Sequence, residues 1–225
     1  MNARYITLMS SLPYLGKLFE VKQPPILQMK LESRLKLLKE KDKALLDKIA
    51  SLIAWPQQPL DRTDAQFVIE AKRFFEEVHS PTLREIVTHA LNVRTIMVAL
   101  RRRRRGENEA PIGQPWGFGR WVGYIERHWR EPDFHLQGMF PWALEANRLL
   151  NDNDSVALER LLFEIHWKVL DRVGAGHYFD FEAVVIYLIR WSMVDHCSGY
   201  SGGAAVERFR KLVGSGITKF TDIFA

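Results

Sequence analysis

Carboxylates and imidazoles at helical spacing are the first residues in this chain that could do chemistry. Glu76 and His79 are three residues apart, and Glu85 and His89 are four apart, so each pair can share one helix face. A ferritin-like di-iron bundle needs two Glu-x-x-His pairs and two further glutamates, and the second pair is missing. We therefore predict no metal site, no catalytic residue and no cofactor, and keep a helical metalloenzyme as a third hypothesis.

The single cysteine, Cys197, stands directly after His196. A catalytic cysteine and its histidine meet in space and need an oxyanion donor, whereas these two residues simply adjoin along the chain. One cysteine excludes an internal disulfide framework and is typical of a reducing compartment. The longest uncharged apolar run near the end, Ala183 to Ile189, is far shorter than the ~20 residues of a membrane span. We expect a cytoplasmic protein.

Five consecutive arginines, Arg101 to Arg105, are the most telling feature of the chain, and we call them the arginine run. They follow an apolar stripe that predicts a long amphipathic helix, which Ser80 can cap and Pro81 can begin. Cations are favoured at the C-terminal end of a helix, and Gly106 can take the left-handed conformation that ends one. The stripe has i, i+3, i+4, i+7 spacing: Leu83, Ile86, Val87, Ala90, Val93, Met97 and Leu100.

The arginine run has two interpretations: a solvated helix end stabilised by the helix dipole, or a binding site for carboxylates or phosphates. Trp116 and Arg120 follow soon after it, and arginine with aromatic residues is typical of protein–protein hot spots and of single-strand nucleic-acid surfaces. We predict Arg101, Arg102, Arg103, Arg104, Arg105, Trp116 and Arg120 as partner-binding residues. The net charge of +5 equals the charge of the run, so no broader basic face is evident, and nucleic-acid binding is the alternative.

A glycine-rich segment, Gly113 to Gly119, lacks the preceding strand and the lysine of a phosphate-binding loop. We interpret it as a loop anchored by its aromatic residues.

The fold class predicted from these patterns is all-α, a multi-helix bundle with at most a minor N-terminal strand. Residues 1–225 are predicted as a single all-helical domain, with two lobes, 1–130 and 131–225, as an alternative. Tyr5 to Met9 is open between strand and helix. A helix is predicted from Leu31 to Trp55, with a break near Lys41-Asp42, and a linker follows it at Pro56 to Pro59. Further helices are predicted from a cap at Asp61 or Thr63 to Val78, from about Gly119 to Arg130, from Pro141 to Leu150, after the turn Asp152 to Ser155 as far as Gly174, after a cap at Asp180, and near Ala204 to Val213 beyond a flexible break at Gly199 to Gly203.

Several segments resemble proteins of rotary ATPases. Asn92 to Ile96, leading to Ala99-Leu100-Arg101, resembles the Asn-Ile-Lys/Arg…Leu-Arg-Ala-Lys/Arg helix of the central-stalk adaptor of V-type and A-type ATPases. Phe181 to Arg190 is similar to that adaptor's Glu-Pro-x-Leu-Ala-Tyr-Leu-x-Arg helix. An uncharacterised bacterial family encoded within V-type ATPase operons is similar to four further segments: Tyr5 to Leu8, Ser10 to Pro13, Glu164 to Asp171 and His177 to Phe181.

The resemblance implies a non-catalytic, all-helical protein that works with a V-type ATPase as adaptor, assembly factor or modulator. Its partners would be stalk or rotor subunits, with no small-molecule substrate, and ATP hydrolysis would belong to other subunits. It would meet the membrane indirectly, through the ATPase. The central-stalk adaptor has three helical repeats, and a chain of this length has room for about two.

Overall fold

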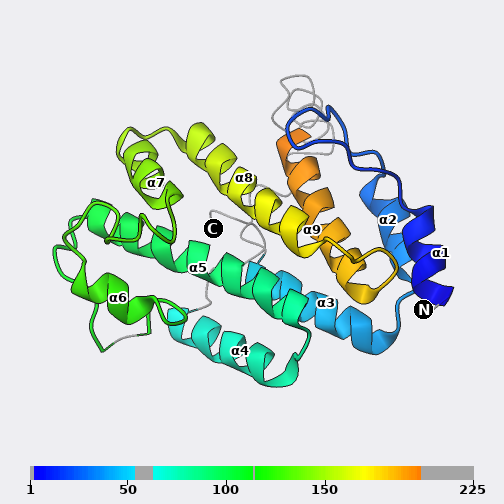
Figure 1. The fold of residues 1–225 in the computed structure, drawn as a ribbon, viewed down its shortest axis with the longest axis horizontal. Helices are drawn as coiled ribbons and strands as arrows, with labels where there is room; N and C mark the ends of the chain where they lie inside the picture. The colour runs from blue at the N-terminus through cyan, green and yellow to red at the C-terminus, as the bar shows by residue number, and fades with distance from the viewer. Residues whose placement is uncertain (1–2, 54–62, 114, 199–225) are drawn as a thin grey trace, which may run out of the picture. The chain divides into compact units, whose positions relative to one another are not determined.

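The computed structural model describes residues 3–53, 63–113 and 115–198, and the regular elements among them are all helices (Figure 1). The predicted all-α class is confirmed, and Tyr5 to Met9 belong to a helix instead of a strand. The predicted helix near Ala204 to Val213 and the linker at Pro56 to Pro59 lie outside the described residues. The helices are α1 (Ala3–Ser11), α2 (Gln28–Leu35), α3 (Glu40–Ile53), α4 (Asp64–Glu77), α5 (Pro81–Arg104), α6 (Val122–Arg127), α7 (Trp142–Asn151), α8 (Ser155–Val173) and α9 (Phe181–Ser198).

The chain divides into two units, and the division falls at other points than the predicted boundary between residues 130 and 131. One unit joins Met1–Leu37 to Tyr178–Ala225, and the other is Leu38–His177. The first unit combines the two ends of the sequence because α9 packs on α1, far away along the chain. A boundary taken from loops and prolines could not reveal a unit built from two separate segments.

Two hydrogen bonds in the first unit fix α9 to the N-terminal segment. The Tyr187 hydroxyl donates to the Pro13 carbonyl at 2.9 Å, and the Trp191 indole N–H donates to the Ile26 carbonyl at 2.9 Å. Burial raises the pKa of Tyr187 to about 12, so its hydroxyl stays protonated at neutral pH and keeps its donor. Buried backbone carbonyls need such donors when no helix or sheet supplies them.

The second unit is organised around α5, which packs against α3, α6, α7 and α8. Figure 1 shows α8 running beside α5, with α6 and α7 near the end of α5 that carries the arginine run. The C-terminal half of α5 is buried on most sides: Val93, Ile96, Met97 and Leu100 are each 0% exposed. This burial fixes α5, which carries Arg101 to Arg104 of the arginine run.

Both ends of α5 follow the predicted chemistry. Ser80 Oγ accepts a hydrogen bond from the Leu83 N–H at 3.4 Å, and proline occupies the first turn. At the other end Gly106 has φ +92°, its N–H donates to the Arg103 carbonyl at 2.9 Å, and the Glu107 N–H donates to the Arg102 carbonyl at 3.3 Å. These two bonds form a Schellman motif, so the arginine run ends at a well-defined turn.

Other helix ends are confirmed in part. Thr63 caps α4 with a reciprocal bond to Gln66, Asp154 caps α8, and Asp180 caps α9. The break between α2 and α3 covers residues 36–39, slightly earlier than predicted. The helix predicted from Gly119 to Arg130 shrinks to the six residues of α6. Within the described parts of the chain, no helix has both the length and the apolarity to cross a membrane.

Candidate functional site

The arginine run does not face solvent as a block, because Arg103 turns into the protein. Its guanidinium lies over the Phe134 ring, 4.7 Å from the centroid. Burial lowers the pKa of Arg103, and nearby Asp133 partly offsets that effect. The guanidinium donates to the carbonyls of Trp129 at 3.3 Å, Glu131 and Pro132 at 2.6 Å, and to Asn147 Oδ1 at 3.1 Å. Arg103 therefore ties α5 to the loop after α6 and to α7.

Three neighbouring arginines, Arg102, Arg104 and Arg105, also contact residues outside the run. Arg102 pairs with Asp64 at the start of α4, at 3.7 Å, and with Glu107 at 3.1 Å. Arg105 also pairs with Glu107, at 3.3 Å. Arg104 donates to the Asn153 side chain in the turn before α8. The run thus joins α5 to its surroundings, a role that five adjacent cations do not reveal in the sequence.

Three members of the run remain exposed at the surface: Arg101, Arg104 and Arg105. Arg120 is exposed as well, and its guanidinium lies 4.8 Å from the centroid of the Trp121 ring. Exposed ion pairs such as Arg105–Glu107 contribute little to stability, about 0–1 kcal/mol. These four side chains can therefore meet an outside partner at small cost to the fold.

Trp116 is a core residue, which removes it from the predicted binding surface. It is 2% exposed, and its indole N–H donates to Glu126 Oε1 at 3.0 Å. Its ring meets the Trp129 ring edge to face at 5.8 Å. Aromatic residues provide large buried area as readily as binding surface, and sequence does not separate the two uses.

The glycine-rich loop is anchored on α5, a contact that the sequence did not indicate. Thr95, buried at 1% exposure, donates to the Phe118 carbonyl at 3.2 Å and accepts from the Phe118 N–H at 3.0 Å. The Phe118 ring stacks on Phe75 at 5.5 Å. A Cβ at Gly117 would lie 2.7 Å from the Thr95 methyl group, so the close approach of the loop to α5 requires glycine there.

A shallow depression lies beside this loop. Its empty volume is about 210 Å³, including solvent open to it, below the about 300–1,000 Å³ of typical ligand pockets. The Arg94 guanidinium lies 3.9 Å from the centroid of the Phe67 ring. The lining residues are Asp64, Phe67, Val68, Arg94, Thr95, Trp116, Gly117 and Phe118.

The four residues of the metalloenzyme hypothesis do not meet as one set of ligands. Glu76 and His79 are exposed at the end of α4. Glu85 forms an ion pair with Arg172 at 2.6 Å. Among the described residues, Glu76, His79, Glu85 and His89 do not form a group whose ligand atoms lie within 4.8 Å of one another.

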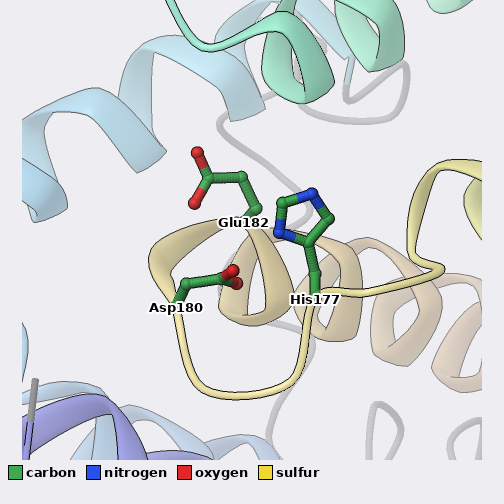
Figure 2. Close-up of side chains that lie close together, drawn as sticks. All are labelled: His177, Asp180 and Glu182. Atoms are coloured by element: carbon green, nitrogen blue, oxygen red, sulfur yellow. The ribbon is translucent and has the colours of Figure 1, made fainter. Parts of the chain in front are cut away.

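A different group does meet that distance, in the stretch leading into α9 (Figure 2). The ligand atoms of His177, Asp180 and Glu182 lie within 4.8 Å of one another. Asp180 accepts a hydrogen bond from the Ala183 N–H at 2.9 Å, and His177 forms a hydrogen bond with the Thr82 hydroxyl at 2.9 Å. One unit ends at His177 and the other begins at the next residue, so we build no site on this group.

Two histidines on different helices lie close together, and the sequence did not predict this contact. His89 on α5 and His166 on α8 meet edge to face, with ring centroids 4.9 Å apart, and we call them the histidine pair. Burial, with a smaller contribution from Arg172, lowers the pKa of His89 to about 4, and Glu85 partly opposes this shift. Burial and the neighbouring His89 lower the pKa of His166 to about 3. Both imidazoles are therefore neutral at pH 7.

A scan against protein-family models, a search of curated proteins and a search of solved structures found no match to this chain. The resemblance to the central-stalk adaptor stays a prediction from the quoted segments. Function is therefore proposed from the described residues and from that resemblance.

Proposed function

We propose that this chain is a non-catalytic helical protein that binds a stalk or rotor subunit of a V-type ATPase, as a component or assembly factor. The exposed guanidinium groups at the end of α5, from Arg101, Arg104 and Arg105, carry the proposal. Guanidinium groups can bind carboxylates in pairs of parallel hydrogen bonds, which suits an acidic protein surface. The sequence resemblance to the central-stalk adaptor supports the choice of partner.

The structural contacts of Arg102 and Arg103 support this assignment. They fix the end of α5 to α4, to the loop after α6 and to α7. The backbone of a fixed helix end loses little freedom when the exposed arginines on it bind, and pre-organisation of this kind increases affinity. A mobile arginine tail would have to be ordered by its partner first.

Carboxylates beside the run favour a protein partner over nucleic acid. Glu107 pairs with Arg102 and with Arg105, and Glu109 is exposed two residues later. A phosphate backbone would meet these negative charges, whereas a protein partner can present both signs in a complementary pattern. Nucleic-acid binding is therefore an outcome of the test below.

The test compares recovery of ATPase subunits from cells by tagged forms of the chain. We expect wild type to recover stalk or rotor subunits, and Arg104→Ser/Arg105→Ser to recover at least fivefold less. The matched control, Lys72→Ser/Arg73→Ser, removes two adjacent exposed cations from α4 and should behave as wild type. Recovery without ATPase subunits, or equal recovery by both double variants, would contradict the proposal. Recovery that nuclease treatment abolishes would assign the arginines to nucleic acid.

A further inference from the structure

The histidine pair lies between two helices that pack closely. His89 projects from α5 and His166 from α8, and these helices are neighbours in the second unit. Their ring centroids are 4.9 Å apart. Imidazoles on two packed helices are held in place by the core around them, which is how metal sites are built in helical bundles.

One nitrogen of the pair has no hydrogen-bond partner among the described residues. This atom, His89 Nε2, is buried. A buried polar atom left unpaired costs about 1–3 kcal/mol, so such an atom in a folded protein calls for an explanation. An imidazole nitrogen is the commonest protein ligand for metals, and a bound ion would satisfy it.

The chemical state of the pair suits a metal. Neutral imidazole has the free lone pair that coordination needs. Glu85 lies one turn before His89 on α5 and pairs with Arg172 at 2.6 Å, so we do not count its carboxylate among the ligands.

The spacing also fits. With metal–nitrogen distances of about 2.0–2.1 Å, two imidazoles on one tetrahedral ion have ring centroids about 5 Å apart. The observed separation of the two ring centroids, 4.9 Å, is close to that value.

We propose that His89 and His166 bind one divalent transition-metal ion of the class that prefers imidazole, with Zn²⁺ as the probe. Water completes the coordination. The ion joins α5 to α8 and stabilises their contact. The site lies apart from the exposed arginines, so it adds to the proposed function and does not depend on it.

Calorimetric titration of the full chain with Zn²⁺ tests the proposal. We expect one ion per chain in wild type, with affinity at least tenfold lower in His89→Gln and in His166→Gln. His79→Gln removes an exposed histidine and should bind within twofold of wild type. Equal binding by the double variant His89→Gln/His166→Gln would overturn the proposal. Loss of binding in His177→Gln, with the pair variants unaffected, would overturn it as well.

A measurement on the wild type avoids any folding defect of the variants. Long-range ¹H–¹⁵N spectra report the imidazole nitrogens directly, and Zn²⁺ should shift one nitrogen of His89 and one of His166 while those of His79 stay unchanged. Zn²⁺ should also raise the unfolding temperature, because it binds the folded chain in preference to the unfolded one. Unchanged nitrogens of the pair at saturating Zn²⁺ would overturn the proposal.

Discussion

Two regions of α5 treat their polar side chains in opposite ways. At the C-terminal end, Arg103 donates to four acceptors and lies over an aromatic ring. In the middle of the helix, His89 is half-buried, and its buried Nε2 has no hydrogen-bond partner among the described residues. A buried polar group with a full set of partners stabilises the fold, whereas one without them carries a cost that a ligand can remove.

The same contrast divides the arginine run. Arg102 and Arg103 contact several segments of the second unit, while Arg104 and Arg105 are exposed. All four residues are arginines at adjacent positions, so the helix face on which each side chain lies determines whether it packs against the protein or remains exposed. We therefore propose that the exposed arginines bind a protein partner and that the imidazole with the unpaired nitrogen binds a metal ion.

The largest effect is expected for Arg103→Ala. This change removes the donors from the carbonyls of Glu131 and Pro132 and from Asn147, so we expect the free energy of unfolding to fall by about 2–4 kcal/mol. Urea unfolding followed by tryptophan fluorescence measures it. Arg103→Lys should recover little, because a single ammonium cannot reach acceptors arranged around a planar fork. A loss below about 0.5 kcal/mol would show that the contacts of Arg103 do not stabilise the fold.

The histidine pair predicts a dependence on pH. Unfolded histidines bind protons near their ordinary pKa of 6.5, but His89 and His166 resist protonation down to about 4 and about 3 when folded. The unfolded state therefore binds more protons, and stability falls as pH decreases through this window, by at most about 1.4 kcal/mol per pH unit for each histidine. The fall ends below the folded pKa values.

This prediction is measured as the difference between wild type and His89→Gln/His166→Gln from pH 7 to pH 4. The difference cancels most of the carboxylate titration that both proteins share. Parallel stability curves would show that the imidazoles are not buried as neutral groups.

For Thr95→Val we expect a loss of stability between those of Arg103→Ala and Arg104→Ser/Arg105→Ser. Thr95 is buried on α5 and exchanges two hydrogen bonds with Phe118, and valine keeps the shape but loses both bonds. We expect a loss of about 1–2 kcal/mol in the free energy of unfolding. Thermal unfolding by circular dichroism measures it, with the exposed Thr88→Val as control. Equal unfolding temperatures for the two variants would show that the loop is not held by this residue.

The smallest effect on stability is expected for Arg104→Ser/Arg105→Ser. Exposed side chains and surface ion pairs contribute little, so the free energy of unfolding should change by less than about 0.5–1 kcal/mol. The same urea experiment as for Arg103 applies. A loss as large as that of Arg103→Ala would place these residues in the fold and weaken their assignment to a partner.

Local signals made much of the fold predictable. Ser80, Pro81 and Gly106 mark the ends of α5, and Thr63 and Asp180 cap α4 and α9 as the sequence indicates. These predictions succeed because caps and glycine turns depend on residues within a few positions of one another.

Contacts between distant segments were not predictable in this way. The bonds of Tyr187 to Pro13 and of Trp191 to Ile26 create a unit from both ends of the chain, and no local pattern indicates them. His166 likewise carries no ligand spacing to His89 along the sequence. Trp116 and Arg103 were predicted as partner-binding residues. Sequence gives composition and periodicity, but it does not show which hydrogen-bond acceptors a side chain contacts in the folded protein.

Site-specific photo-crosslinking tests the central claim most directly. A photoreactive amino acid at Asn108, exposed just beyond the arginine run, leaves every arginine intact, and the same group at Lys72 on α4 is the matched control. We predict crosslinks from position 108 to a stalk or rotor subunit of the V-type ATPase in cells, and none to it from position 72. Equal crosslinking from both positions, or crosslinks from position 108 to nucleic acid alone, would contradict the account.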